Sequence, residues 1–364
     1  MNELEGIILG EIRREGTISF ARFMEMALYF PALGYYETPG RIGKEGDFYT
    51  SVSVGDFFGG LLAWSCLEVA ERLETKSFHI LEAGANDGRL SGDILDWLQK
   101  FRPELAARTH YRILEPSILQ RETQRETLSR FGNRVQWFSD WPEIAPFAGI
   151  IFSNELFDAM PAHVLKWDAN QKVWREWGVG EQNGVWVWKP LERRSGTPAG
   201  APQIPEDLKP VLPEGFTVEI CPAAARWWRE AARRLKTGRL LAIDYGAAES
   251  ELLTPRFAAG TLRGYSRHHG GGDVLSRPGE QDITAHVNFT ALEKAGAGEG
   301  LQTVDFTRQE SFLSKLFERV WKAHPNLIQG KELRQLRTLT HPEHLGRSFR
   351  VLAQERMRPG SPTI

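Results

Sequence analysis

The chain has 364 residues, of which 41% are hydrophobic and 25% are charged, and its formal net charge is −2. This composition excludes disordered and fibrous proteins, and the near-neutral charge excludes a protein drawn to nucleic acid by its overall field. Only two cysteines occur, Cys66 and Cys221, without metal-ligand spacing, so we expect neither a disulfide scaffold nor a metal. The N-terminus is acidic where a targeting peptide is basic, and no long apolar run occurs, so we expect a cytoplasmic protein without a membrane span.

The first 75 residues are predicted to be mainly helical. Apolar residues recur at helical spacing over 2–30, and a second helical pattern runs over about 54–73. Between them lies a loop at 39–51 that is rich in glycine and polar residues. We expect this region, 1–75, to form a cover over a larger core.

Strands and helices alternate from residue 77 onward. Short apolar runs predict strands at 77–83, 111–114, 135–138 and 149–152, with helices at 90–100 and 117–131 between them. This order predicts an α/β fold with a parallel sheet and right-handed crossovers. A helix at 223–236 and a strand at 239–243 extend the pattern. The predicted elements that complete the core are helices at 289–296, 308–322 and 331–338 and strands at 301–306 and 348–354.

The core is predicted to be interrupted by a meander. Residues 163–190 alternate apolar and polar types around two turn signals, which indicates antiparallel strands, and a loop rich in proline and glycine follows at 191–215. We therefore divide the chain into a cover (1–75), a core (76–162 and 216–356) and an insertion (163–215). The meander tryptophans are predicted to lie on one face, either as a contact surface for a protein substrate or as ordinary packing: Trp167, Trp174, Trp177, Trp186 and Trp188.

A glycine-bearing turn, 80-ILEAGANDGRL-90, follows the first predicted core strand. Gly84 and Gly88 allow a ligand to approach the backbone, and Asn86 is a residue type that tolerates positive φ. Such a turn binds nucleotide-like cofactors, which leaves NAD and S-adenosylmethionine (SAM) open. The acid Glu82 at the strand tip suits the sulfonium and amino groups of SAM better than a pyrophosphate.

Further acids follow the second and fourth predicted strands. Glu115 ends the second strand, in YRILEPS, where nucleotide-binding sheets hold ribose hydroxyls. Asn154, Glu155 and Asp158 lie in 153-SNELFDAMP-161, just beyond the fourth strand. These acids either grip a cationic substrate or belong to a capped helical turn on the surface.

A third group of polar residues follows the fifth strand. Asp244 stands at the end of that strand, and the long segment 246–282 is predicted to be a functional loop. Tyr265, His268, Asp282 and His286 lie in or beside it, and their density favours a lid over the site.

Eight blocks of this sequence resemble the MidA-like SAM-dependent methyltransferases: 19-SFARFMEMALYFPALGYY-36, 46-GDFYTS-51, 82-EAGANDGRL-90, 111-YRILEPS-117, 154-NELFDAMP-161, 240-LLAIDYG-246, 260-GTLRGY-265 and 278-PGEQDITAHVNF-289. The resemblance implies a Rossmann-like core with a seven-stranded sheet and SAM as cofactor. It also implies methylation of a protein arginine, on a subunit of respiratory complex I (NADH dehydrogenase), with a homodimer left open.

The resemblance also implies roles for single residues. The turn residues, with Glu115 and Asn154, would bind the cofactor, and Glu155 and Asp158 would face the methyl group. Asp47, Thr50 and Ser51 would fold over the cofactor as a cover. The chain departs from the usual family pattern at Asn86, Val52, Ser53 and Asn288.

The expected chemistry is methyl transfer to a guanidinium, a poor nucleophile that two carboxylates can orient. Glu155 and Asp158 are the predicted pair, with His286 or Asp244 as proton acceptor. The sequence leaves three alternatives open: a SAM-binding assembly factor without activity, a nicotinamide-dependent oxidoreductase and a small-molecule methyltransferase.

Overall fold

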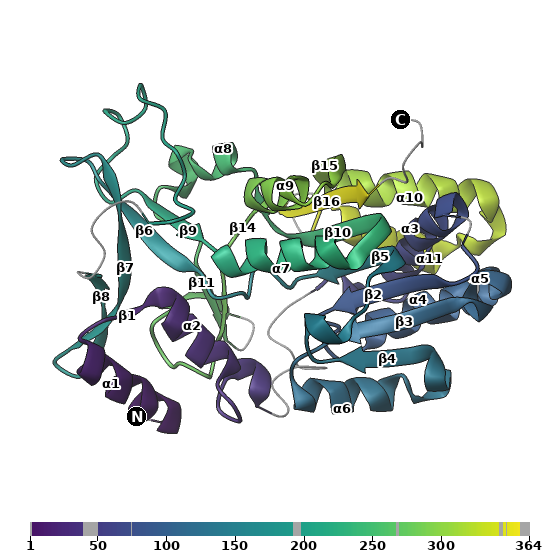
Figure 1. Cartoon of the computed structure of the whole chain (residues 1–364), viewed down its shortest axis with the longest axis horizontal. Coiled ribbons are helices and arrows are strands. Elements are labelled where there is room, and N and C mark those ends of the chain that lie inside the picture. The colour runs from purple at the N-terminus through teal and green to yellow at the C-terminus, as the bar shows by residue number, and fades with distance from the viewer. Residues whose placement is uncertain are drawn as a thin grey trace. The chain divides into compact units, whose positions relative to one another are not determined.

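The computed structural model describes residues 2–38, 50–73, 75–191, 198–266, 269–341, 345–346 and 348–356. The chain forms two compact units, each assembled from three segments (Figure 1). The first unit comprises Met1–Phe48, Phe157–Arg226 and Gly246–Ala291, and the second comprises Tyr49–Leu156, Trp227–Tyr245 and Leu292–Ile364. The predicted division into cover, core and insertion assigns functional roles to parts of the chain, and it stays a prediction.

A mostly parallel sheet forms the centre of the second unit. Its strand order is β15 (Gln302–Arg308), β16 (Phe349–Arg356), β10 (Leu235–Ala247), β5 (Phe147–Asn154), β2 (Phe78–Ala83), β3 (Thr109–Leu114) and β4 (Val135–Phe138). Only β16 runs antiparallel to its neighbours. The α/β fold is therefore confirmed. An eighth strand, β14 (Val287–Asn288), pairs with Gly246 and Ala247 at the end of β10, so the described sheet has one strand more than expected.

Helices cover both faces of this sheet. They are α3 (Phe57–Leu73), α4 (Arg89–Phe101), α5 (Pro103–Ala107), α6 (Ile118–Thr127), α7 (Pro222–Arg234), α9 (Phe289–Gly298), α10 (Gln309–Ala323) and α11 (Gly330–Thr340). Side chains of a strand alternate between the two faces of a sheet, so neighbouring residues of β16 contact helices on opposite faces. Gln354 accepts a hydrogen bond from Trp228 of α7, whereas Glu355 binds Arg72 of α3.

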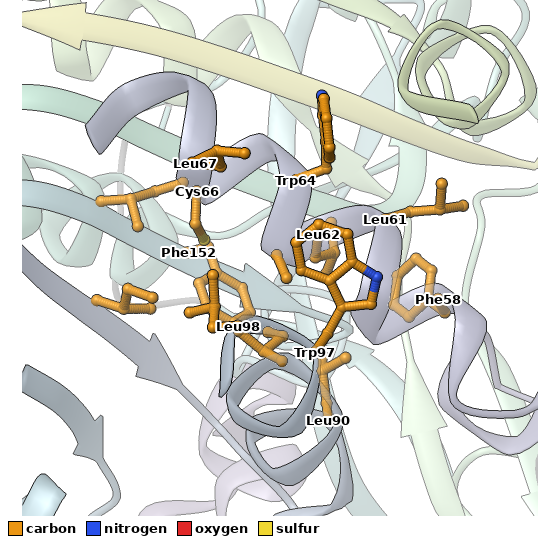
Figure 2. Packing of buried hydrophobic residues seen from close by; sticks show 14 of the residues in the cluster. Phe58, Leu61, Leu62, Trp64, Cys66, Leu67, Leu90, Trp97, Leu98 and Phe152 are labelled. Atoms are coloured by element: carbon orange, nitrogen blue, oxygen red, sulfur yellow. The ribbon is translucent and has the colours of Figure 1, made fainter. Parts of the chain in front are cut away.

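The core of the second unit lies where α3 packs on α4 and β5 (Figure 2). Fourteen of the 17 residues of α3 are buried, as expected for a helix that is apolar on most sides. Gly59 and Gly60 permit this close packing, since a Cβ at either position would come within 2.8 Å of Asp93 or Trp97. The Trp64 and Trp97 rings meet edge to face, 5.8 Å apart.

An ionic cluster around the buried Glu355 joins α3 to the sheet. Glu355 is 3% exposed and accepts two hydrogen bonds from Arg72, at 2.9 and 2.5 Å, and one from Arg239 at 2.9 Å. Burial opposes ionisation, but the two arginines hold the pKa of Glu355 below its ordinary value.

We expect Glu355→Ala to lower the free energy of unfolding by about 2–3 kcal/mol, because it leaves the mostly buried Arg239 without its closest partner. Urea denaturation measures this loss. Glu318→Ala is the control, because its ion pair with Lys322 is exposed on both sides, and it should cost less than about 0.5 kcal/mol. Equal losses in the two variants would contradict the structural role of Glu355.

The first unit contains the predicted meander. β6 (His163–Asp168), β7 (Val173–Gln182) and β8 (Val185–Pro190) form antiparallel neighbours, and β1 (Ile18–Ser19) and β9 (Thr217–Ile220) complete a five-stranded sheet. Helices α1 (Glu3–Glu15) and α2 (Phe20–Tyr29) precede it in the chain. The buried side of α2 packs with residues of this sheet in one hydrophobic cluster.

The meander tryptophans occupy both faces of that sheet, so the prediction of a single face is wrong. Trp167 and Trp174 are 2% exposed and pack with Phe216 in one cluster. Trp177, Trp186 and Trp188 pack against the other cluster, in which Phe20 of α2 lies 4.9 Å from the Trp188 ring. The tryptophans thus make packing contacts on both faces, with Trp167 and Trp174 buried and Trp177, Trp186 and Trp188 half-buried.

The segment 246–282, predicted to be a long ordered or mobile loop, contains regular secondary structure. It contains α8 (Glu249–Leu252), β11 (Arg263–Ser266) and β12 (His269–Gly272), and β11 pairs with both β12 and β13 (Asp282–Thr284). The prediction of one long loop is wrong. These short strands are stabilised by pairing with one another, and their sequences lack the alternation of apolar and polar residues that would have indicated strands. None of the described helices has the length and apolar character needed to cross a bilayer.

Candidate functional site

Four strands of the second unit end at the same edge of its sheet. Ala83 of β2 pairs with both Leu114 of β3 and Ser153 of β5, and Ile243 of β10 pairs with Asn154. The residues that follow these positions therefore lie along one edge. Ligands of open α/β sheets bind at this carboxyl edge. The predicted residues that the structure brings to this edge are Glu82, Gly84, Asn86, Gly88, Glu115, Asn154, Glu155 and Asp244.

The glycine-bearing turn leads from β2 into α4. Gly84, Asn86 and Gly88 have φ values of +68°, +48° and +81°, so the predicted tolerance of positive φ at Asn86 is confirmed. The N–H of Gly84 donates to the carbonyl of Leu114 at 3.3 Å, which ties the turn to β3. Gly88 is the N-cap of α4 and has no side chain, and the Asp87 carboxylate accepts a hydrogen bond from the Arg89 N–H in the first turn at 3.1 Å.

Glu82 lies behind this turn and is only 2% exposed. Its Oε2 accepts hydrogen bonds from Ser91 at 2.5 Å and Tyr111 at 2.6 Å. Burial raises the pKa of Glu82 to about 7, against the opposing effect of these two donors. The side chain therefore connects β2, β3 and the first turn of α4, and we infer that it positions the turn from behind.

The Glu82 carboxyl should make stability depend on pH. Its pKa is 4.5 for the ordinary group and about 7 in the folded chain, so the folded state holds an extra proton between these values. Stability should fall as pH rises from about 4.5 to about 7, by about 2–3 kcal/mol for this group. Urea denaturation at pH 5 and pH 8 should show a smaller loss for Glu82→Gln than for the parent. Parallel losses in both proteins would contradict the raised pKa.

Glu115 follows β3 and is 7% exposed. Its backbone N–H donates to the carbonyl of Phe138 at 2.9 Å, which continues the pairing with β4. Its Oε1 accepts from the Ser117 N–H and its Oε2 from the Gln124 side chain, both at 3.1 Å. The carboxylate is thus fixed in direction, as a group that binds two ribose hydroxyls must be.

The end of β5 carries polar atoms that fit a bound cofactor. Among the described residues, the buried Asn154 Oδ1 and Ser153 Oγ have no hydrogen-bond partner. They are two of ten such buried atoms among the described residues, and at a carboxyl edge a bound ligand would satisfy them. The Asn154 amide donates to Glu155 Oε1 at 3.1 Å. Glu155 itself has a φ of +54°, an uncommon conformation for glutamate that is typical of functional sites.

Asp244 is completely buried in β10, three residues before the strand ends at Ala247. Its carboxylate accepts hydrogen bonds from the N–H of Leu156 at 3.1 Å and of Tyr245 at 2.8 Å. Because the N–H of Glu155 donates to the carbonyl of Ile243, the backbone around Glu155 is held from both sides. This geometry favours a role for Asp244 in holding the turn.

Thr50 and Ser51 are connected to the same edge. The completely buried Ser51 donates to Gln309, which follows β15. Arg308 at the end of β15 and Asp244 of β10 both pair with Arg350 of β16, so β15 ends level with Asp244. Asp47, predicted as part of the same cover, lies outside the described residues.

A second polar cluster lies in the first unit. Asp158 and Asp282 are 6% and 7% exposed, and the Tyr36 hydroxyl donates to Asp282 Oδ1 at 2.9 Å. Burial and the charges of both acids raise the pKa of Tyr36 and of Tyr265. The two carboxylates and two phenol rings are therefore near one another, an arrangement whose chemistry suits a cation.

His286 is joined to this cluster through the backbone. The N–H of Ala285 donates to the carbonyl of Asp158 at 2.9 Å, and the N–H of His286 donates to Thr261 Oγ1 at 2.9 Å. Thr261 in turn donates to the buried Glu219. Asp158 and His286 thus share one local framework in the first unit. His268 lies outside the described residues.

Sequence analysis missed several residues of these sites. Ser91 and Tyr111 hold Glu82, Tyr36 joins the acidic cluster, and Glu219 supports the His286 segment. Ser91, Tyr111 and Tyr36 lie in or next to a quoted block but carried no signal of their own, since hydroxyl and phenol groups are common in any core, and Glu219 lies outside the quoted blocks.

Comparison with known proteins identifies the family. The model of a family described as "Putative S-adenosyl-L-methionine-dependent methyltransferase" matches residues 61–307. A Burkholderia thailandensis protein solved in complex with S-adenosyl-homocysteine (SAH) is 29% identical and superimposes with a TM-score of 0.80, covering 97% of this chain and 92% of that one. The predicted cofactor is therefore confirmed as SAM, which removes NAD from the open choices.

Curated relatives match nearly the whole chain. The mitochondrial protein arginine methyltransferase NDUFAF7 of Rattus norvegicus is 26% identical over 97% of this chain and 85% of its own length. The Homo sapiens protein of the same name is 26% identical over 95% and 82%. These names contradict the predicted cytoplasmic location, which is wrong by this comparison. The acidic residues near the N-terminus were not sufficient to predict the cellular compartment.

Proposed function

The chain belongs to this family of SAM-dependent methyltransferases, and we propose that it methylates the guanidinium group of an arginine in a protein. The observation that carries the proposal is the similarity to relatives named protein arginine methyltransferases over 95–97% of the chain. The segments that hold Asp158, Asp282 and His286 lie within that length.

The cofactor supplies a methyl group on a sulfonium, so the protein need only bind and align the acceptor and exclude water. We place the cofactor at the carboxyl edge of the second unit, on the turn 84–88, with its ribose on Glu115. Asn154, Thr50 and Ser51 complete the proposed cofactor contacts. The level strand ends, the positive-φ turn and the unpartnered Asn154 Oδ1 support this placement.

We propose that Asp158 binds the acceptor guanidinium, with Asp282 as a second carboxylate. A guanidinium is a poor nucleophile because its charge is shared among three nitrogens. Carboxylates that bind two of the nitrogens draw the charge toward them and orient the third. His286, held beside Asp158 through Ala285, is the proposed proton acceptor. Glu155 lies in the other unit, so its pairing with Asp158 stays a prediction.

Two alternatives remain as outcomes of one experiment. The purified chain is incubated with methyl-labelled SAM and host-cell lysate, separated into protein and protein-free fractions. We expect label on arginine of a protein band, identified by mass spectrometry. Label in the protein-free fraction alone would support a small-molecule methyltransferase, and SAH binding without transfer would support an assembly factor. A complex I subunit is the proposed acceptor and would appear as the labelled band.

Removing an acidic charge should separate binding from transfer. We expect Asp158→Asn to keep SAH affinity within about 3-fold but to lower transfer about 100-fold, because the amide cannot balance the guanidinium charge. Glu155→Gln is expected to act in the same direction. Asp96→Asn is the control, because it removes an exposed acid that pairs only with Arg130 in the described contacts. Full activity in both site variants would contradict the assignment of these acids.

A further inference from the structure

Helix α6 buries a single residue, and that residue is a glutamine. Gln124 is 0% exposed, whereas the other residues of α6 are exposed or half-buried. A surface helix normally buries apolar side chains. A lone buried amide must make its hydrogen bonds within the protein or lose stability.

Both polar atoms of the Gln124 side chain, Nε2 and Oε1, make hydrogen bonds within the protein. Its Nε2 donates to the carbonyl of Asn86 at 2.9 Å and to Glu115 Oε2 at 3.1 Å. Its Oε1 accepts from the Trp137 indole at 3.1 Å. A primary amide provides two donors and an acceptor in one planar group, which no other uncharged side chain of this length provides.

These contacts join two parts of the cofactor site that come from different strands. Asn86 belongs to the turn after β2, and Glu115 follows β3. Because C=O and N–H of a trans peptide group lie on opposite sides, the bond to the Asn86 carbonyl also fixes the direction of the Asp87 N–H.

The close approach of α6 to the turn is an independent feature of the packing. A Cβ on Gly88 would lie 3.3 Å from Leu128 Cδ1 and 3.5 Å from the Cα of Gln124. The glycine therefore leaves room for the helix segment that carries the amide. Because the contact is with Gly88 itself, this packing holds the Gln124 amide against the turn.

We propose that Gln124 is a positioning residue that sets the spacing between the glycine turn and the ribose-binding carboxylate, and so determines the affinity for SAM and SAH. This inference rests on the proposed placement of the cofactor. Gln124 itself is assigned no contact with the cofactor and acts through Asn86 and Glu115.

The first test is SAH binding to Gln124→Leu, measured by calorimetry. Leucine keeps most of the volume but removes both donors, so we expect the Kd to rise about 10–100-fold. The matched control is Gln354→Leu. Gln354 is also 0% exposed, accepts from the Trp228 indole at 2.7 Å, and donates to the Glu293 carbonyl at 3.0 Å and to Thr303 at 3.1 Å. It lies in β16 opposite Leu240, which precedes Asp244 by four residues in β10, so its loss should lower stability while leaving the SAH Kd within about 2-fold.

The second test distinguishes positioning from general stability. If Gln124 acts through Glu115, the two substitutions are not independent, and Gln124→Leu should cost less than about 3-fold in a Glu115→Gln background. Effects that multiply in the double variant would overturn the proposal. An SAH Kd within about 3-fold of the parent in folded Gln124→Leu would also overturn it.

Gln124→Glu keeps the acceptor for Trp137 and serves if the leucine variant does not fold. It replaces the donor with a like charge beside Glu115, so we expect at least the same loss of affinity, and unchanged affinity would overturn the proposal. If Glu115→Gln alone leaves the SAH Kd unchanged, the proposed cofactor site fails. If Glu115→Gln weakens binding and neither Gln124 variant does, only this inference fails.

Discussion

Replacing Gly84 with valine should raise the Kd for SAH by about 100-fold or more. The residue has a φ of +68°, which a β-branched side chain adopts only with strain. A Cβ at this position would also lie 2.9 Å from Leu156 Cδ1. The Leu156 side chain can shift, but the backbone strain at positive φ remains, so we expect the turn to move and the backbone surface proposed to bind the cofactor to move with it. Calorimetric titration with SAH measures the effect.

The control for this variant is Gly184→Val. Gly184 has a φ of +78°, but a Cβ there would meet nothing within 4 Å. Strain alone should lower its stability and leave the SAH Kd unchanged. If Gly84→Val folds and binds SAH like the parent, the turn is not part of the cofactor site.

Glu115→Ala should weaken SAH binding about 100-fold, because two ribose hydroxyls lose a charged acceptor. The loss should be specific to the ribose. The parent should prefer SAH strongly over its 2′,3′-dideoxy analogue, and the alanine variant should bind the two about equally.

A variant that binds SAH weakly but keeps the parent's preference for the hydroxyls would contradict the assignment. In that case Glu115 would act on the fold of the site and not on the ribose. Far-ultraviolet circular dichroism of the variant excludes gross unfolding as the cause of weak binding.

The parallel core was predictable because its strands are continuous apolar runs. The runs 77–83, 111–114, 135–138 and 149–152 correspond to β2, β3, β4 and β5 within a few residues. A strand buried on both faces needs such a run, and a glycine-bearing turn follows from the chemistry of the cofactor. The positions of Gly84, Gly88 and Glu115 at one edge were therefore inferred correctly from the order of elements.

Structure built from distant, short pairings was not predictable. β1 is two residues long and pairs with Val179 and Gly178 of β7, and β11 and β13 pair across 15 intervening residues of mixed polarity, 267–281. In such strands the hydrogen bonds come from a partner far along the chain, and the local pattern carries little information. This explains why the segment 246–282 was taken for a loop.

The prediction that the meander tryptophans lie on one face was wrong for a different reason. Trp174 and Trp177 lie in one strand and are separated by an odd number of positions, so they face opposite sides of the sheet. The period of two was sufficient to predict this. By contrast, nothing in the polar sequence of α6 indicated that Gln124 would be its one buried residue, because that depends on where Asn86 and Glu115 come to lie.

The central claim is that SAM binds at the carboxyl edge of the second unit, and a crystal structure of the chain grown with SAH tests it most directly. We expect density for the ligand along the turn 84–88, with both ribose hydroxyls on Glu115 and the Asn154 side chain in contact with it. Well-defined ligand density at any other place on the molecule would contradict the account.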